Sequence, residues 1–514
     1  MMMKKYCLLI LLLPGFKSYA NRIPQITQCD VRIDNQTLVV SYEMYDAEDT
    51  QLEVRCRIIF KDGPNRNKEV AIQSTQGDIG WPITPGSNKS IRIILERNTD
   101  LSAALTIILS AYDRQPLRME ELLADVSGER IKNDMLALQG KRNESTDKAF
   151  KEQARAYIRD ILSIKDYLNS YESKVGSLTN INYESTRWGT AQSDSLEIID
   201  AHYDSYGQAP GADDNASGTC GVLEAYRVLA PYASKKSMRF ILFDLEENGL
   251  VGSNLYVNNQ LPVSDHVDNV INFEMIGYYS EMNNTQDLPA GFNILFPDAY
   301  NKVIANNRRG DFINNIGNTT SKSLIAAFQT TAESFVPELK LLSLEVPGNG
   351  SIAPDLRRSD HASFWDKGYR ALMITDGANF RNKNYHTPRD SAQYLDYTFM
   401  NNVIKTSIAT MALLAGVEHG TSAAITFTPS VSTRDLKNPL LDVYQGGRTI
   451  YIKGQDIDDI REIILINSTG QTFRMKLPQG QNQFTINSNY PPGMYFILFD
   501  VTNSKLIHKI FVSE

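Results

Sequence analysis

Cysteine, tryptophan and histidine are scarce in this chain of 514 residues, and basic residues do not outnumber acidic ones. Four cysteines are too few for a disulfide-based scaffold of this length. The 52 Lys and Arg against 60 Asp and Glu give a formal net charge of −8, which argues against nucleic acid or an anionic membrane as a partner. After the N-terminus, no apolar run is long enough to cross a bilayer. The length and the 42% hydrophobic content therefore predict a globular protein of several domains.

The first 20 residues have the pattern of a secretory signal peptide. Lys4 and Lys5 precede the short apolar run Cys7–Pro14, and the small-residue segment Ser18-Tyr19-Ala20 is typical of a cleavage site. A buried N-terminal helix is the alternative, but the run is short and no amphipathic pattern follows it. We therefore expect a secreted or cell-surface protein, cleaved after residue 20.

Residues 21–115 read as an all-β domain. The segments LVVSYEMYD, LEVRCRIIF, SIRIILE and ALTIILSAYD have strand lengths and are separated by turn residues such as Asp-Gly and Pro-Gly. Short, regular strands of this kind predict a β-sandwich. Cys29 and Cys56 both lie in its strand-like segments and could pair in an oxidising compartment, whereas Cys220 reads as a buried thiol.

Residues 116–418 show a different pattern, in which apolar strands alternate with helices. The expected strands are LEIIDAH, RFILFD, VINFE and RALMIT. The alternation predicts an α/β domain with a mainly parallel sheet and helices on both faces, flanked by two small all-β sandwich domains.

Polar residues follow the end of each of these strands, where ligands bind in open α/β sheets. Two imidazoles, His202 and His386, should converge there with the carboxylates Asp213, Glu247 and Glu274. Nitrogen and oxygen ligands of this kind suit catalytic zinc. Five ligands exceed the need of one catalytic ion and suit two ions that share a carboxylate. A solvated Asp-rich turn is the alternative for the loop after His202, but it does not explain the other strand ends.

These motifs resemble the signature set of the secreted di-zinc aminopeptidases, to which glutamate carboxypeptidase II and glutaminyl cyclase are more distant relatives. The resemblance extends from about residue 125 to residue 417, with all blocks in order. The blocks that carry it are His202-x-Asp204, Gly211-Ala212-Asp213-Asp214-Asn215-Ala216-Ser217-Gly218, Glu246-Glu247-x-Gly249-Leu250-x-Gly252-Ser253, Glu274-Met275-Ile276-Gly277, Ser359-Asp360-His361 and His386-Thr387-x-x-Asp390.

The resemblance implies a role for each matching residue. Asp213 would bridge two zinc ions, with His202 and Glu274 completing one site and Glu247 and His386 the other. Glu246 would act as the general base, and Asp204 would orient His202.

One position, Glu274, departs from the family pattern, and Tyr385 and His361 lie next to or within the motifs. The family more often has Asp where Glu274 stands, which changes the reach of that carboxylate. Tyr385 could donate a hydrogen bond to the developing oxyanion, and packing is its alternative role. His361 is interpreted as a structural residue or as support for a ligand, not as a ligand itself.

Residues 419–438 are rich in Thr, Ser and Pro and read as a linker. Strand patterns follow over residues 439–514. This segment resembles the C-terminal sorting domain of proteins exported by the type IX secretion system, through its Asn-Ser-Thr-Gly-Gln turn, its Pro-Gly-Met-Tyr strand start and its terminal lysine-bearing strand. The resemblance implies the export machinery as a partner. A plain accessory or carbohydrate-binding module is the alternative.

The sequence thus predicts a secreted zinc-dependent exopeptidase, with peptide or protein N-termini as substrates. In this mechanism a metal-activated water attacks the scissile carbonyl while Glu246 moves the proton. A glutaminyl-cyclase-like acyltransferase with a single zinc and a non-catalytic binding protein on the same fold are the alternatives. The loops Glu281–Pro289 and Thr331–Pro354 are expected to form the walls of the substrate pocket.

Overall fold

The computed structural model describes residues 21–428, apart from 35–36, 97–98, 100–102 and 165–166, and seven strands between residues 441 and 512. The chain forms two compact units, one of Met1–Thr99 with Leu105–Phe427 and the other of Asp100–Ala104 with Thr428–Glu514. The predicted signal peptide, residues 1–20, lies outside the described residues. Within the described part of the chain, every helix is too short or too polar to span a membrane.

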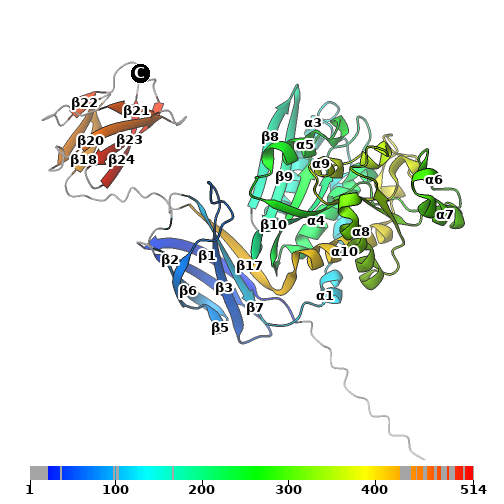
Figure 1. Cartoon of the computed structure of the whole chain (residues 1–514), viewed down its shortest axis with the longest axis horizontal. Helices are drawn as coiled ribbons and strands as arrows, with labels where there is room; N and C mark the ends of the chain where they lie inside the picture. Colours follow the sequence, from blue (N-terminus) through cyan, green and yellow to red (C-terminus); the bar gives the residue numbers. More distant parts are fainter. Residues whose placement is uncertain are drawn as a thin grey trace, which may run out of the picture. The chain divides into compact units, whose positions relative to one another are not determined.

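The centre of the first unit is an eight-stranded sheet with the order β15-β14-β16-β13-β10-β12-β9-β8 (Figure 1). Strand β10 is parallel to both β12 and β13, β13 is parallel to β16, and β14 is parallel to β15, while the other pairs are antiparallel. The predicted α/β class with a mainly parallel sheet is confirmed. The strands are β8 (Tyr167–Val175), β9 (Leu178–Arg187), β10 (Gln192–His202), β12 (Lys236–Phe243), β13 (His266–Phe273), β14 (Ile313–Asn318), β15 (Leu341–Val346) and β16 (Ala371–Thr375).

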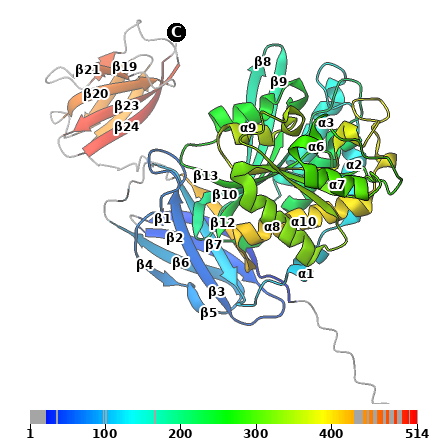
Figure 2. The same cartoon turned by 45° about the vertical axis from the view of Figure 1, so that its right-hand side comes forward.

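Helices cover both faces of this sheet (Figures 1 and 2). Alternate residues of each strand point to opposite faces, so Ile199 and Phe240 belong to one hydrophobic core and Ile198 and Ile241 to the other. The helices of the first core are α1 (Met119–Ala124), α2 (Gly128–Leu138), α3 (Lys148–Leu162), α4 (Gly218–Leu229), α8 (Lys322–Phe335) and α10 (Tyr397–Ala415). The other helices are α5 (Val251–Leu255), α6 (Phe292–Leu295), α7 (Pro297–Ala305) and α9 (His361–Asp366), and the second core includes residues of α6, α7 and α9.

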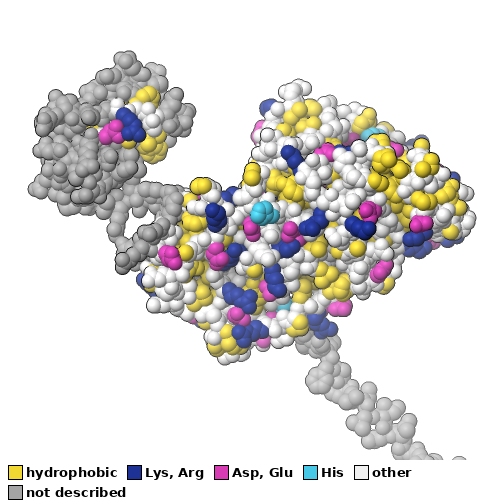
Figure 3. Space-filling model, viewed as in Figure 1, with side chains coloured by type: hydrophobic (Ala, Val, Ile, Leu, Met, Phe, Trp, Pro, Cys, Tyr) yellow, Lys and Arg dark blue, Asp and Glu magenta, His cyan; other side chains and the backbone are white. Residues whose placement is uncertain are grey.

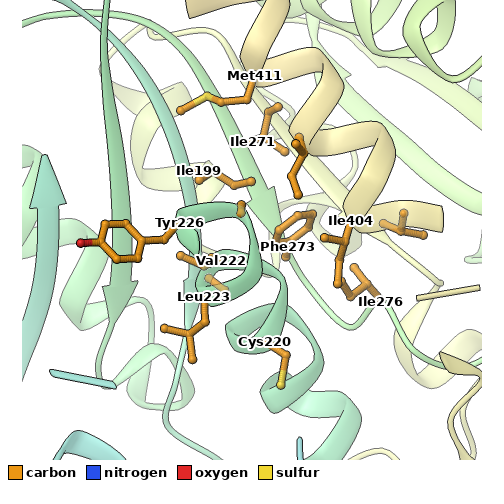
Figure 4. Close-up of a cluster of buried hydrophobic side chains, with 14 of the residues drawn as sticks. Ile199, Cys220, Val222, Leu223, Tyr226, Ile271, Phe273, Ile276, Ile404 and Met411 are labelled. Atoms are coloured by element: carbon orange, nitrogen blue, oxygen red, sulfur yellow. The ribbon is translucent and has the colours of Figure 1, made fainter. Parts of the chain in front are cut away.

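Part of the first core lies where α4 and α10 meet β10 and β13 (Figure 4). Val222 of α4 lies beside Phe273 of the sheet, and Ile404 of α10 lies on the other side of Phe273. Because α4 follows directly after the loop that contains Asp213 and Asp214, this packing fixes one end of that loop.

The N-terminal β-sandwich has two sheets, with the orders β1-β2-β6-β4 and β11-β17-β7-β3-β5. Strand β17 comes after α10 and pairs antiparallel with β7, so the end of the α/β domain returns to the first domain. The predicted linker 419–438 is therefore wrong for residues 419–427, which lie in β17. The physical reason is that β7 is buried along its whole length and needs a strand on each side. The strands are β1 (Gln25–Asp34), β2 (Thr37–Tyr45), β3 (Leu52–Phe60), β4 (Ile72–Gly77), β5 (Gly80–Ile83), β6 (Gly86–Leu95), β7 (Leu105–Tyr112), β11 (Tyr232–Ser234) and β17 (Val417–Phe427).

The C-terminal segment forms two antiparallel sheets, β18-β19-β22 and β21-β20-β23-β24. Two sheets of this size are what the predicted β-sandwich over residues 439–514 requires. The strands are β18 (Leu441–Gly446), β19 (Thr449–Gly454), β20 (Ile460–Asn467), β21 (Thr472–Met475), β22 (Gln483–Thr485), β23 (Gly493–Val501) and β24 (Ser504–Val512).

Two features of the surface and the thiols bear on the sequence predictions. Basic and acidic side chains are interspersed over the face shown in Figure 3, which agrees with the small charge excess of the sequence. Cys29, Cys56 and Cys220 are all free thiols, so the expected pairing of Cys29 with Cys56 is absent from this structure.

The close packing of Gly221 in α4 against the sheet can be tested by measuring stability. A Cβ atom at Gly221 would lie 2.7 Å from Cε2 of Phe273, so Gly221→Ala should overpack this core and destabilise the fold by about 1–3 kcal/mol. Gly128→Ala, also in a helix but with no atom within 4 Å, is the matched control and should change stability by less than about 1 kcal/mol. Thermal unfolding of both variants is the measurement, and equal melting temperatures would contradict this account of the packing.

Candidate metal centre and substrate pocket

Three neighbouring parallel strands bring the predicted residues to one edge of the sheet. His202 is the last residue of β10 and pairs in register with Phe243 at the end of β12, while Ala201 pairs with Phe273 at the end of β13. Glu246 and Glu247 follow β12 in the short helix η2 (Glu246–Asn248), and Glu274 follows β13 directly. The carboxyl ends of the strands therefore place these side chains together, as expected.

The first group of side chains surrounds His202. Its Nε2 lies 3.3 Å from Oε2 of Glu274, 3.5 Å from Oδ1 of Asp214 and 3.9 Å from Oε2 of Glu246. His202, Glu246 and Glu274 together present ligand atoms within 4.8 Å of one another, a spacing that a metal ion could fill. The extra methylene of Glu274 does not prevent its carboxylate from reaching this group.

The second group surrounds His386. Its Nε2 lies 3.1 Å from Oδ2 of Asp214 and 3.1 Å from Oε2 of Glu247. Asp214 thus turns one oxygen toward His202 and the other toward His386, so a single carboxylate lies between two sets of nitrogen and oxygen atoms.

The prediction that Asp213 bridges the two groups is wrong, because the structure places Asp214 there. Asp213 faces away from both histidines: its Oδ1 accepts a hydrogen bond from the Gly277 N–H at 3.0 Å and its Oδ2 accepts one from Nδ2 of Asn382 at 2.7 Å. The backbone explains the difference. Asp214, with φ −104° and ψ 89°, is not helical although it lies within η1 (Ala212–Ser217), so the chain kinks and the two neighbouring carboxylates point in different directions.

A second layer of hydrogen bonds holds the ligand atoms in place. Asp204 accepts the backbone N–H groups of Glu246 and Glu247 at 3.1 Å and 3.3 Å, and its Oδ1 lies 3.3 Å from Nδ1 of His202. One carboxylate therefore orients a histidine of the first group and fixes both glutamates, which agrees with the role expected for Asp204.

The remaining ligands have supports of their own. The Ser359 hydroxyl donates to Oε2 of Glu274 at 2.8 Å. Asp390 accepts the backbone N–H groups of Asp213 and Asp214 at 2.9 Å and 3.1 Å, which ties the bridging loop to the segment that contains His386.

The electrostatics of the site fit a bound cation. Burial, followed by the charge of Asp214, raises the pKa of Glu247 to about 8, and burial raises the pKa of Glu246 well above its usual range. Burial disfavours protonated His386, but the carboxylates of Asp214 and Glu247 outweigh it and raise the pKa of His386 to about 9. Carboxylates crowded in this way need positive charge nearby.

The hydrogen-bonding state of the same side chains points the same way. Nε2 of His202, Nε2 of His386, Oδ2 of Asp214 and Oε1 of Glu247 are buried atoms without a hydrogen-bond partner. Buried polar atoms without partners are rare in folded proteins. Imidazole nitrogens and carboxylate oxygens are also zinc ligands, so the residues present fit one zinc ion in each group.

Tyr385 lies at the same edge, and Arg358, which the sequence analysis missed, contacts it. Nη2 of Arg358 donates a hydrogen bond to the Tyr385 hydroxyl at 2.9 Å. Burial, followed by the charges of Asp214 and Glu274, raises the pKa of Tyr385, so its hydroxyl keeps its proton. Because the oxygen accepts from Arg358, that proton is free to be donated toward the metal groups. No motif includes Arg358, so only the fold reveals it.

His361 is not part of either group. It is fully buried, its Nε2 lies 3.0 Å from the carbonyl oxygen of Leu356, and its ring packs edge-on against Trp365. Burial lowers the pKa of His361 to about 3, so it stays neutral. This position agrees with the prediction that His361 has a structural role and is not itself a metal ligand.

A pocket opens beside the metal groups, with Glu274, Arg358 and Tyr385 among its lining residues. Its other walls are largely apolar and include Phe292, Ile316, Leu344, Leu356, Met373 and Phe380. The loop before Pro289 contributes, as expected. The prediction that Thr331–Pro354 is a loop is wrong over much of this segment, because the segment includes the end of α8 and all of β15. Leu344 lines the pocket from β15.

Part of the chain is similar to known proteins. Residues 182–411 match the model of Peptidase family M28. The uncharacterized protein YfbL of Escherichia coli is 33% identical over 223 residues, which cover 41% of this chain and 64% of YfbL. Aminopeptidase YwaD of Bacillus subtilis is 50% identical over 64 residues, which cover 12% of this chain and 14% of YwaD.

A third relative, a probable zinc metalloprotease of Pyrenophora teres f. teres, is 25% identical over 286 residues, covering 49% of this chain and 56% of the relative. The chain thus spans less than two thirds of the length of each of these three relatives. One of these relatives is named an aminopeptidase and another a probable zinc metalloprotease. The segment that matches the family model, residues 182–411, contains all the metal-group residues.

Proposed function

We propose that this chain is an aminopeptidase that holds two zinc ions and releases the N-terminal residue of peptides. One observation carries the proposal: the carboxylate of Asp214 lies between two groups of zinc-type ligands, and one of these ligands, Glu274, also lines a pocket. A carboxylate shared by two metal ions is the usual arrangement in two-metal hydrolases. The names of relatives, aminopeptidase and zinc metalloprotease, support the same reaction.

Glu246 is the residue placed to move the proton. When bound, the zinc ions supply a water of lowered pKa and polarise the scissile carbonyl. Glu246 lies at the edge of the His202 group, 3.9 Å from its Nε2, which is longer than the distances of the other carboxylates. It would take a proton from the attacking water and deliver it to the nitrogen of the breaking C–N bond, so that a carboxylate and an amine leave.

Tyr385, which lines the pocket, supports the same step. Its hydroxyl accepts from Arg358 and therefore directs its own proton away from that residue. A hydrogen bond from this hydroxyl to the carbonyl oxygen would stabilise the negative charge that develops there.

The charge of the site favours a free amino group over a free carboxylate in the substrate. Five carboxylates, those of Asp204, Asp214, Glu246, Glu247 and Glu274, exceed the charge of two divalent cations. The remaining negative charge attracts an ammonium group. Arg358, the cation that lines the pocket, already contacts Asp355, Asn379 and Tyr385.

The apolar walls of the pocket suggest which N-terminal residues are preferred. We expect Leu and Phe to fit best, because the pocket offers aliphatic and aromatic contacts and no unpaired charge. Apolar pockets discriminate by about 1–3 kcal/mol for each methylene group that they bury.

Hydrolysis of aminoacyl 4-nitroanilides tests the proposal. Leu and Phe substrates should be cleaved with kcat/KM at least about tenfold above the Ala substrate, and a Glu substrate should be cleaved more slowly still. N-acetyl-Leu 4-nitroanilide, which lacks the free amine, is the control and should not be cleaved. A chelator should abolish the activity.

The same enzyme sample separates the alternatives. Mass spectrometry of a peptide mixture shows whether residues leave from the N-terminus, as proposed, or from the C-terminus. A peptide with N-terminal Gln would yield pyroglutamate without loss of a residue if the chain were a single-zinc cyclase. Metal binding without any turnover would indicate a non-catalytic binding protein.

Amide substitutions test the individual roles, with zinc content and turnover measured for each variant. Glu246→Gln should keep two zinc ions per chain and lose at least about 10²-fold in turnover, because an amide cannot accept the proton. Asp214→Asn should lose zinc, because the bridging carboxylate is removed from both groups.

Asp213→Asn is the matched control, one residue away and equally buried. It should keep both zinc ions and lose only about 1 kcal/mol of stability from an altered hydrogen bond to Gly277 or Asn382. Zinc loss in Asp213→Asn with retention in Asp214→Asn would reverse the assignment of the bridge.

We also propose that the chain is exported, with residues 1–20 removed and residues 439–514 engaging the export machinery. The apolar N-terminal run and the two-sheet C-terminal domain support this. Mass spectrometry of the extracellular protein should find Asn21 at its N-terminus. Deletion of residues 439–514 should leave active peptidase inside the producing cell, and its appearance in the medium would rule out the sorting role.

A further inference from the structure

The imidazole of His386 lies between two tyrosine rings. The Tyr206 ring is parallel to it within 2°, with ring centroids 3.8 Å apart, and the Tyr385 ring is parallel within 17°, at 3.7 Å. Two rings at this spacing cannot share one face of an imidazole, so they lie on opposite faces. Aromatic pairs more often have centroids about 4.5–7 Å apart, so this close stack on both faces is a specific arrangement.

The two histidines of the metal groups are held in different ways. Nδ1 of His202 lies 3.3 Å from Oδ1 of Asp204, the type of outer contact that usually orients a metal-binding histidine. Within the residues that the structure describes, Nδ1 of His386 has no such carboxylate, and only its Nε2 faces Asp214 and Glu247. The rings of Tyr206 and Tyr385 are what prevent the His386 imidazole from turning.

Tyr206 is exposed to solvent and still contacts His386. It lies in the loop after β10, and 46% of its surface is exposed although it is a large aromatic residue. The loop around it is firmly held, since Arg142 donates to the carbonyl oxygens of Pro210 and Gly211 at 3.0 Å and 2.7 Å. A ring on a fixed loop can hold His386, which lies 180 residues away in the sequence.

The charge of the stack favours its role. An imidazole that binds a cation is poor in electrons, and the faces of tyrosine rings are rich in electrons, so the two attract each other. The attraction is strongest when a metal is bound and thus stabilises the metal-bound orientation of His386.

We propose that Tyr206 is a positioning residue that, with Tyr385, fixes the His386 ring by stacking in place of a hydrogen bond to Nδ1. The group of Asp214, Glu247 and His386 then binds its metal more tightly when the Tyr206 ring is present. The proposal rests on the metal binding in the proposed function and is independent of the reaction catalysed.

The test measures zinc binding to the full chain by competition with a chelator, in the wild type and in Tyr206→Leu, Tyr206→Phe and Tyr394→Leu. Tyr206→Leu removes the ring and should lower the affinity for one of the two zinc ions by about 10–100-fold, the usual effect of losing a residue that supports a metal ligand. The other ion should bind as in the wild type. Tyr206→Phe keeps the ring and should bind both ions within about threefold of the wild type.

Tyr394→Leu is the matched control, because Tyr394 is also 46% exposed and stacks on no metal ligand among the described residues. It should bind both ions like the wild type. The melting temperature of the metal-free Tyr206→Leu protein should stay close to that of the metal-free wild type, which separates ligand positioning from a loss of folding.

Three results would overturn the proposal: unchanged zinc binding in Tyr206→Leu, an equal loss in Tyr206→Phe, or a metal-free Tyr206→Leu protein that no longer folds. A wild-type chain that binds no zinc would instead refute the proposed function, so the two failures are distinguishable.

Discussion

The crowding of buried carboxylates at one edge of a parallel sheet is the constraint on which the rest of this structure depends. Asp214, Glu246 and Glu247 lie close to one another with little solvent, and burial raises the pKa of both glutamates. Folding alone does not balance this charge. A protein that keeps such a cluster gains from bound cations, and the free energy of metal binding then adds to the stability of the fold.

The backbone around the cluster shows what the arrangement costs. Leu245 and Met275, which flank the ligand-bearing segments, have φ values of 54° and both are in the left-handed region, as is His386 with φ 58°. Each such residue costs about 1–3 kcal/mol. The hydrogen bonds to Asp204 and Asp390 and the packing of α4 against the sheet offset this cost.

The sequence predicts much of this architecture because two simple rules apply to it. Apolar strands that alternate with helices form a parallel sheet, and polar residues at the strand ends converge, so His202, Glu247 and Glu274 are found from their positions, whereas the role of Glu246 is implied only by the family resemblance. Asp213 and Asp214 are adjacent and chemically identical, and only the kink of the backbone decides which one faces the histidines. Strand β14 escapes detection because Ile-Asn-Asn-Ile-Gly-Asn is mostly polar although every residue is buried. The roles of Tyr206 and Arg358 could not be predicted from the sequence, because they depend on contacts between distant segments.

Strand β17 has a consequence for the order in which the chain is assembled. It lies between β11 and β7 in a sheet whose other main strands belong to the first domain, and it pairs with β7 from Gly420 to Phe427. During synthesis the first domain therefore emerges with β7 as an open edge, and this edge stays uncovered until some 300 further residues have been made. The two domains become complete together, so a nascent chain that stalls within the α/β domain exposes a strand edge that recruits other chains.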